Sequence, residues 1–92
     1  MLVILLNFVA YNNRDANDIH FFGYRFMFYS NDHEPIHVHI LKDGCEAKYN
    51  VCPIKQVYNH GFKKHDIALI ESLLEENEEI IKNRWKTFFD KE

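Results

Sequence analysis

The alternation of apolar and polar residues is clearest on either side of Asp43–Gly44, where it predicts a β-hairpin. The two alternating runs are Ile36–Leu41 and Cys45–Val51. Asp-Gly between such runs is the strongest short-range hairpin signal and favours a type I′ turn. With a two-residue loop, Lys42 pairs with Cys45. A slip of one residue would mix apolar and polar positions, so the register is well specified. The face that is apolar apart from Lys42 carries Ile36, Val38, Ile40, Ala47, Tyr49 and Val51.

The aromatic segment His20–Ser30, which precedes this hairpin, predicts one further strand because it also alternates. The polar stretch Tyr11–Asp18 has no period and predicts a loop, and the apolar stretch Met1–Ala10 predicts a strand. On the aromatic strand, one face is expected to carry Phe22, Tyr24, Phe26 and Phe28.

Two helices are predicted after the hairpin. Pro53 in a first turn and Gly61 past an end indicate a short helix between them. A long helix follows from Lys64 to about Phe89, with Lys63 as a poor N-cap and a carboxylate, Asp66, in its first turn. Its apolar stripe has helical spacing and consists of Ile67, Ile70, Leu73, Leu74, Ile80, Ile81, Trp85, Phe88 and Phe89.

These elements together predict an α+β fold in two layers, in which an antiparallel sheet of three or four strands packs against one short and one long C-terminal helix. The length of 92 residues suits a single domain, 1–92, with an N-terminal extension over 1–18 and a core over 20–89. A hydrophobic content of 47% excludes a disordered chain. The net charge of -3 argues against a protein that binds nucleic acid by charge alone.

The cysteines and the apolar N-terminal run bear on the compartment. Within one strand, Cys45 and Cys52 lie roughly 23 Å apart, whereas a disulfide needs Cα atoms within about 7 Å. Two unpaired thiols predict a reducing compartment, so we expect a cytoplasmic protein. The run Met1–Ala10 is shorter than the roughly 20 residues that span a membrane. It also lacks the basic segment and cleavage site of a secretory signal, so no membrane association is expected.

The polar face of the hairpin holds the residues with the greatest chemical potential. His37 and His39 point the same way because they are two residues apart on a strand. The register places Lys48 opposite His39, with Glu46 one step along. If the aromatic strand pairs beside them, Arg25 and Tyr29 join the same face, turned away from the apolar layer under the long helix.

Three interpretations of this face remain open. In a metal-free phosphoryl-transfer site, His37 and His39 serve as general base and acid, while Lys48 and Arg25 stabilise the phosphate charge. In a metal site, the two imidazoles are ligands and the third ligand is His33, Asp32 or Glu34, although the Lys48 ammonium opposite His39 is unfavourable there. In the third, the face is simply polar and discourages pairing between sheet edges.

Three segments resemble one bacterial family, the domain of unknown function numbered four-one-six-zero. They are Phe28–His39 (FYSNDHEPIHVH), Gly44–Lys48 (GCEAK) and Asn59–Phe62 (NHGF). The family is marked by an E-P-P-H-V-H motif followed by G-E-A-K, and the resemblance covers about Phe22–Phe89. It implies a small α+β protein often encoded beside another small protein. Some members are described as the toxin half of a type II toxin–antitoxin pair.

The resemblance carries over to seven positions, and two others depart from the family pattern. The second proline of the motif is Ile36 here, and the usual hydroxyl N-cap of the long helix is Lys63. The leading hypothesis is therefore a toxin that pairs with a small antitoxin and cleaves RNA without a cofactor. A non-enzymatic protein-interaction module and a histidine-based metal-binding module are the alternatives. The matching positions are Tyr29, Glu34, Pro35, His37, His39, Glu46 and Lys48.

Overall fold

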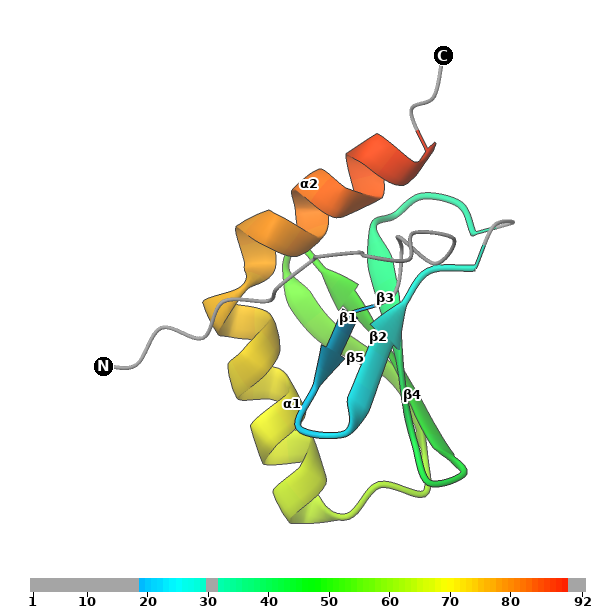
Figure 1. Cartoon of the computed structure of the whole chain (residues 1–92), viewed down its shortest axis with the longest axis vertical. Helices are drawn as coiled ribbons and strands as arrows, with labels where there is room; N and C mark the ends of the chain where they lie inside the picture. The colour runs from blue at the N-terminus through cyan, green and yellow to red at the C-terminus, as the bar shows by residue number, and fades with distance from the viewer. Residues whose placement is uncertain (1–18, 30–31, 90–92) are drawn as a thin grey trace.

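An antiparallel five-stranded sheet with two helices on one of its faces is the architecture of the chain (Figure 1), as seen in a computed structural model that describes residues 19–29 and 32–89. This confirms the predicted α+β class. The strands lie side by side in chain order. The strand and loop predicted for 1–18 lie outside the described residues. The elements are β1 (Ile19–Phe21), β2 (Tyr24–Met27), β3 (His37–Lys42), β4 (Cys45–Val51), β5 (Ile54–His60), α1 (Lys64–Glu76) and α2 (Glu78–Phe89).

The β3–β4 hairpin has the predicted turn and the predicted register. Asp43 and Gly44 have φ values of 51° and 83°, as a type I′ turn requires. Lys42 pairs with Cys45, and His39 pairs with Lys48. The residues of the apolar face between the strand ends are fully buried, namely Val38, Ile40, Ala47, Tyr49 and Val51.

The aromatic segment forms a second hairpin, so the prediction of one continuous strand was wrong. Strands β1 and β2 are joined by Phe22 and Gly23, with φ values of 53° and 86°. A bulky residue seldom has a positive φ, which is why Phe-Gly gave no turn signal. Phe22 was expected on the apolar face, but its position in the turn leaves it 62% exposed.

The short helix predicted between Pro53 and Gly61 is also wrong, because this segment is β5. Val51 pairs with Ile54, so Cys52 and Pro53 form a two-residue turn in which the missing proline N–H costs no ladder bond. The register shifts opposite the junction of Lys48 and Tyr49, which leaves one residue of β5, Val57, as a bulge.

The long helix begins at Lys64 with Lys63 as its N-cap, as predicted, but it is divided at Asn77. The Asn77 side-chain amide donates to the Leu73 carbonyl at 2.8 Å, and its φ of -123° is not helical. The first of the two helices contacts β5 and the second contacts β4 (Figure 1). Neither helix of the described part is long and apolar enough to cross a membrane.

The core fills the space between the helices and the sheet, and two tyrosine hydroxyls join these layers. Tyr24 of β2 donates to Asp66 of α1, and Tyr49 of β4 donates to Glu71 of the same helix at 2.6 Å. Asp66 also accepts the backbone N–H of Lys63 at 3.2 Å. One carboxylate therefore caps the helix and attaches it to the sheet. The largest fully buried side chains include Tyr49, Phe26, Phe28, Ile40, Ile70, Leu73, Leu74 and Ile81.

Candidate functional site

His37 and His39 lie on the same side of β3, opposite Val38 and Ile40, as strand alternation requires. Their ring centroids are 5.1 Å apart. Because the rings are this close, they form one cluster. The cross-strand partner of His37 is Asn50.

Both imidazoles are buried, at 4% and 5% exposure, although we expected them on a polar face turned away from the apolar layer under the long helix. The His37 ring lies 5.1 Å from the ring of Trp85, a core residue of α2. The His39 ring lies 4.3 Å from that of Tyr29, which follows β2. A helix side chain and the β2–β3 loop thus cover this part of the sheet, and neither contact follows from the local alternation of β3.

Asp32, in the β2–β3 loop, places its carboxylate between the two imidazoles. Its Oδ1 lies 3.1 Å from His37 Nε2, and its Oδ2 lies 3.3 Å from His39 Nε2. The Tyr29 backbone N–H donates to Oδ2 at 2.7 Å, and the Asp32 N–H donates to the Tyr29 carbonyl at 2.9 Å, so the loop fixes the carboxylate. Among the third ligands considered from the sequence, Asp32 reaches the histidines, whereas His33 and Glu34 are exposed.

The partner of His37 Nδ1 shows which nitrogen of this ring carries the proton. Nδ1 lies 2.9 Å from the carbonyl oxygen of Pro35, which only accepts, so Nδ1 carries a proton. In a neutral ring, Nε2 then directs a lone pair at the Asp32 carboxylate. This buried Nε2 has no hydrogen-bond partner among the described residues. Two lone pairs at this distance repel, so the geometry calls for a cation, either a proton or a metal ion, between His37 and Asp32.

A second group of polar side chains lies beside the other ring nitrogen of His39, which makes no hydrogen bond among the described residues. This nitrogen, Nδ1, lies 3.4 Å from Glu46 Oε2, and the same oxygen accepts the Tyr58 hydroxyl at 2.7 Å. Tyr58 was not predicted to belong to the site because its segment was assigned to a helix. In the structure, residues 54–60 form a strand. Tyr58 of this strand pairs with Lys48, and this register places Tyr58 beside Glu46.

The pKa shifts in this cluster have identifiable causes. Burial by itself raises the pKa of Asp32, but the Tyr29 N–H and the contacts with His37 and His39 outweigh it and hold that pKa below its ordinary value. Burial, followed by the hydrogen bond to Glu46, raises the pKa of Tyr58 to about 12. Burial also raises the pKa of Tyr29. At neutral pH, Asp32 is therefore an anion and Tyr58 remains a hydrogen-bond donor.

Arg25 and Lys48, the cations predicted for the site, flank the cluster on different strands. Arg25 is exposed on β2 and pairs with Leu41, which in turn pairs with Glu46. Lys48 pairs with His39 on β4. Because His39 turns Nδ1 toward Glu46 of β4 and Nε2 toward Asp32, a cation between the Nε2 atoms lies on the side of the ring away from β4. This placement weakens the objection that Lys48 repels a bound metal.

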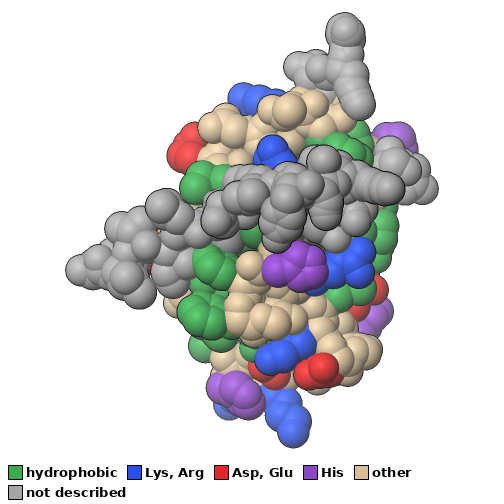
Figure 2. All heavy atoms as spheres, viewed as in Figure 1, with side chains coloured by type: hydrophobic (Ala, Val, Ile, Leu, Met, Phe, Trp, Pro, Cys, Tyr) green, Lys and Arg blue, Asp and Glu red, His purple; other side chains and the backbone are tan. Residues whose placement is uncertain are grey.

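The charged side chains on the face seen in Figure 2 are of both signs. Lysine or arginine, acidic and histidine side chains are interspersed over its coloured part and form no continuous basic surface. This distribution agrees with the net charge of -3. It gives no support to nucleic-acid binding by charge alone.

A family model described as a domain of unknown function, DUF4160, matches residues 23–86, which is 64 of the 92 residues. No curated protein and no solved structure shows a significant match to the chain. The matched range includes Asp32, His37, His39, Glu46 and Tyr58. The chain therefore belongs to the DUF4160 family, as its histidine-containing motif predicted.

Proposed function

We propose that this protein is a metal-binding module whose centre consists of Asp32, His37 and His39, and that it takes a divalent transition-metal ion, Zn²⁺ in the first place. One observation carries the proposal. The three potential ligand atoms lie within 4.8 Å of one another, and one of them is the buried, unpartnered His37 Nε2.

The separations between ligand atoms suit such an ion. Zinc bonds of about 2.0–2.1 Å to nitrogen and oxygen imply about 3.3 Å between neighbouring ligands of a tetrahedron. Asp32 Oδ1 lies 3.1 Å from His37 Nε2 and 3.4 Å from His39 Nε2. The widest separation in the cluster, within 4.8 Å, requires only a small movement of side chains.

The groups behind the ligands support the same assignment. Histidine ligands typically donate their second ring nitrogen to a carbonyl or carboxylate, which fixes the ring and raises its basicity. Pro35 supplies such a carbonyl for His37, and Glu46 places a carboxylate oxygen 3.4 Å from His39 Nδ1, which makes no hydrogen bond among the described residues. Two imidazoles favour a transition metal over Ca²⁺ or Mg²⁺, which prefer oxygen.

The test is titration of the metal-free protein with Zn²⁺ by calorimetry, with the bound metal counted by elemental analysis. We expect one ion per chain, and we expect Asp32→Asn or His39→Gln to abolish stoichiometric binding. His33→Gln is the matched control because His33 is exposed and adjacent to Asp32 in the same loop. Substoichiometric binding by the wild type would show that a proton and not a metal occupies the cluster. Equal binding by Asp32→Asn would show that Asp32 is not a ligand and would overturn the proposed centre.

A toxin that pairs with an antitoxin and cleaves RNA in the cytoplasm stays a prediction. The two free thiols, Cys45 and Cys52, support a reducing compartment. The burial of both imidazoles favours metal binding over direct proton transfer between these rings and a large substrate. A protein-interaction module likewise stays an alternative.

A further inference from the structure

The bulge at Val57 determines which face of the sheet the second half of β5 presents. Gln56 donates to the Tyr49 hydroxyl in the core, so the first half of β5 turns its even-numbered residues toward the helices. Regular alternation would continue this pattern. The extra residue reverses it, and Tyr58 and His60 lie on the opposite face, which also carries the histidine cluster and is here called the outer face. Bulges often redirect side chains beside functional sites.

The two redirected side chains form a stack of nearly parallel rings. The ring centroids of Tyr58 and His60 are 4.5 Å apart, and the ring planes are inclined by 13°. The Tyr58 hydroxyl donates to Glu46, which fixes the Tyr58 ring. His60, stacked on that ring, is exposed. Proteins that bind single-stranded nucleic acid stack bases on aromatic side chains of this kind.

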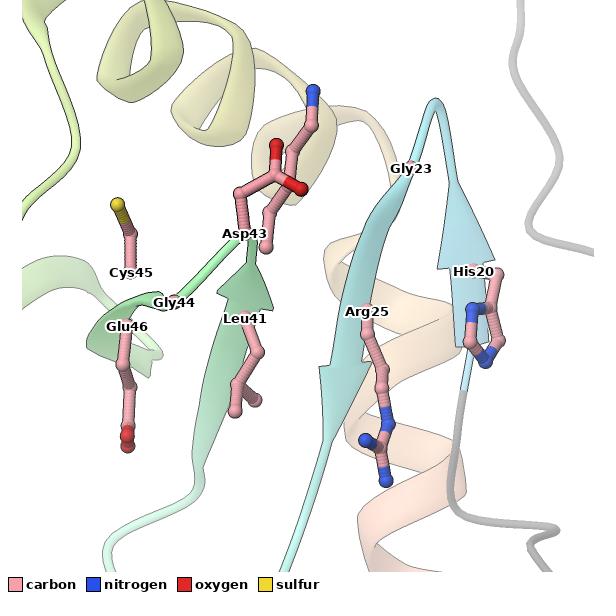
Figure 3. A pocket seen from close by; sticks show the side chains of 9 residues that line it. His20, Gly23, Arg25, Leu41, Asp43, Gly44, Cys45 and Glu46 are labelled. Atoms are coloured by element: carbon pink, nitrogen blue, oxygen red, sulfur yellow. The ribbon is translucent and has the colours of Figure 1, made fainter.

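A row of paired residues runs across all five strands of the outer face and ends at this stack. Four of its side chains extend in the same general direction in Figure 3. They are among the residues that line a cavity of about 360 Å³, so the row leaves space above the sheet. The row consists of His20, Arg25, Leu41, Glu46 and His60.

The outer face is positively charged, although the whole chain has a net charge of -3. In the described part of the chain, and outside the histidine cluster, its cations are Arg25, Lys48 and Lys55, and its anion is Glu46. Lys48 pairs with Tyr58 and therefore lies across from the stack. The face thus combines an exposed ring with an excess of cations, which suits a polyanion that carries aromatic groups.

We infer that the outer face binds single-stranded RNA, with a base stacked on His60 and backbone phosphates beside Lys48 and Lys55. An acidic peptide would match the cations, but its carboxylates do not extend a stack of rings. Unpaired bases stack on histidine and tyrosine side chains, whereas the bases of a duplex are enclosed. Asn50, which pairs with Lys55, offers an amide to the 2′-hydroxyl that distinguishes RNA from DNA. The inference goes beyond the metal centre and requires no bound ion.

The test is fluorescence anisotropy with a labelled oligouridylate of about eight nucleotides, titrated with the full chain in metal-free and zinc-loaded form. We expect saturable binding that is at least about fivefold weaker for His60→Ala, because one stacked base is lost. His60→Phe retains a ring and should retain the affinity. His65→Ala is the matched control, since His65 is an exposed histidine of α1.

The phosphate contacts are measured by the salt dependence of the affinity. For a single strand, each lost contact lowers the slope of log affinity against log salt concentration by about 0.7 in magnitude. The double variant Lys48→Gln, Lys55→Gln should therefore lower it by about 1.4. Lys64→Gln, at the exposed start of α1, should leave the slope unchanged. An unchanged slope in the double variant would contradict the assignment of these lysines.

Other results would overturn the inference as a whole. They are an absence of saturable binding, equal affinities of wild type and His60→Ala, and equal affinity for a duplex or for the deoxyribose oligomer. Displacement of the probe by oligoglutamate as effectively as by unlabelled RNA would identify an acidic protein segment as the occupant. Normal RNA binding without stoichiometric zinc overturns the metal centre alone, and zinc binding without RNA binding overturns this inference alone.

Discussion

The Tyr58 hydroxyl donates a hydrogen bond of 2.7 Å to Glu46, and this bond connects the edge strand β5 to the histidine cluster. The carboxylate accepts from Tyr58 and lies 3.4 Å from His39 Nδ1 through the same oxygen atom. A side chain outside the proposed metal ligands therefore holds the carboxylate that lies beside His39.

From this bond we expect Tyr58→Phe to weaken zinc binding. Loss of a group behind the ligands typically lowers metal affinity by about 10–100-fold. A reduction near the lower end is expected, because Glu46 itself remains. Tyr24→Phe is the control, since it removes another tyrosine–carboxylate bond but one that lies at the start of α1. Competition titration against a coloured chelator measures the affinities, and equal values for the two variants would exclude this role of Tyr58.

Tyr49→Phe should lower the free energy of unfolding by about 1–2 kcal/mol, because a half-buried Glu71 loses its donor. The same hydroxyl accepts from Gln56 at 3.0 Å, so that amide also loses a partner. Urea unfolding monitored by circular dichroism gives the difference. Val57→Ala on the same sheet is the comparison, since Val57 is exposed and should change stability little. An unchanged urea midpoint in Tyr49→Phe would show that this hydrogen bond does not contribute to stability.

Stability should fall on the alkaline side. Burial and a bond to a carboxylate raise the pKa values of Tyr24 and Tyr49 to about 12, whereas tyrosine in an unfolded chain titrates near about 10. A pKa raised in the folded state gives a stabilisation that is complete below about pH 10 and lost as the pH approaches about 12. Urea midpoints between pH 9 and pH 11.5 should therefore decline less steeply in the double variant Tyr24→Phe, Tyr49→Phe than in the wild type. Parallel declines would contradict the assignment.

The toxin hypothesis has a direct cellular test. Induced expression should slow growth, and co-expression of the neighbouring small protein should restore it. Catalysis by the cluster requires that His37→Ala, His39→Ala abolish the effect while His33→Ala retains it, because His33 is exposed and lies outside the cluster. Unchanged growth with and without the neighbour would end the toxin interpretation. Loss of RNA cleavage in extracts treated with a chelator would contradict the metal-independent version.

The predictability of the fold depended on whether a local signal was present. Asp43–Gly44 specified a turn and hence a register, and the stripe from Ile67 to Phe89 specified helix. The β1–β2 turn was not predictable, because Phe22 takes a positive φ, which bulky residues seldom adopt. Asn77 interrupts the helix, and its side-chain amide donates to the carbonyl of Leu73. The apolar periodicity does not reveal this interruption.

The site was predictable as a set of residues on one face but not as an environment. Alternation placed His37 and His39 together, and the register placed Lys48 and Glu46 across from them. Their burial depends on Trp85, distant in the sequence, and the position of Asp32 depends on an irregular loop. Neither has a periodic signature.

The bulge at Val57 affects whether another strand can pair with the free edge of β5. In the described part of the chain, β5 pairs with β4 alone, so its outer rim offers backbone groups to any extended peptide. A strand added there needs a regular ladder, and an extra residue halfway along breaks its spacing. The bulge therefore disfavours the addition of a strand along β5, both from a second copy of the chain and from an extended peptide.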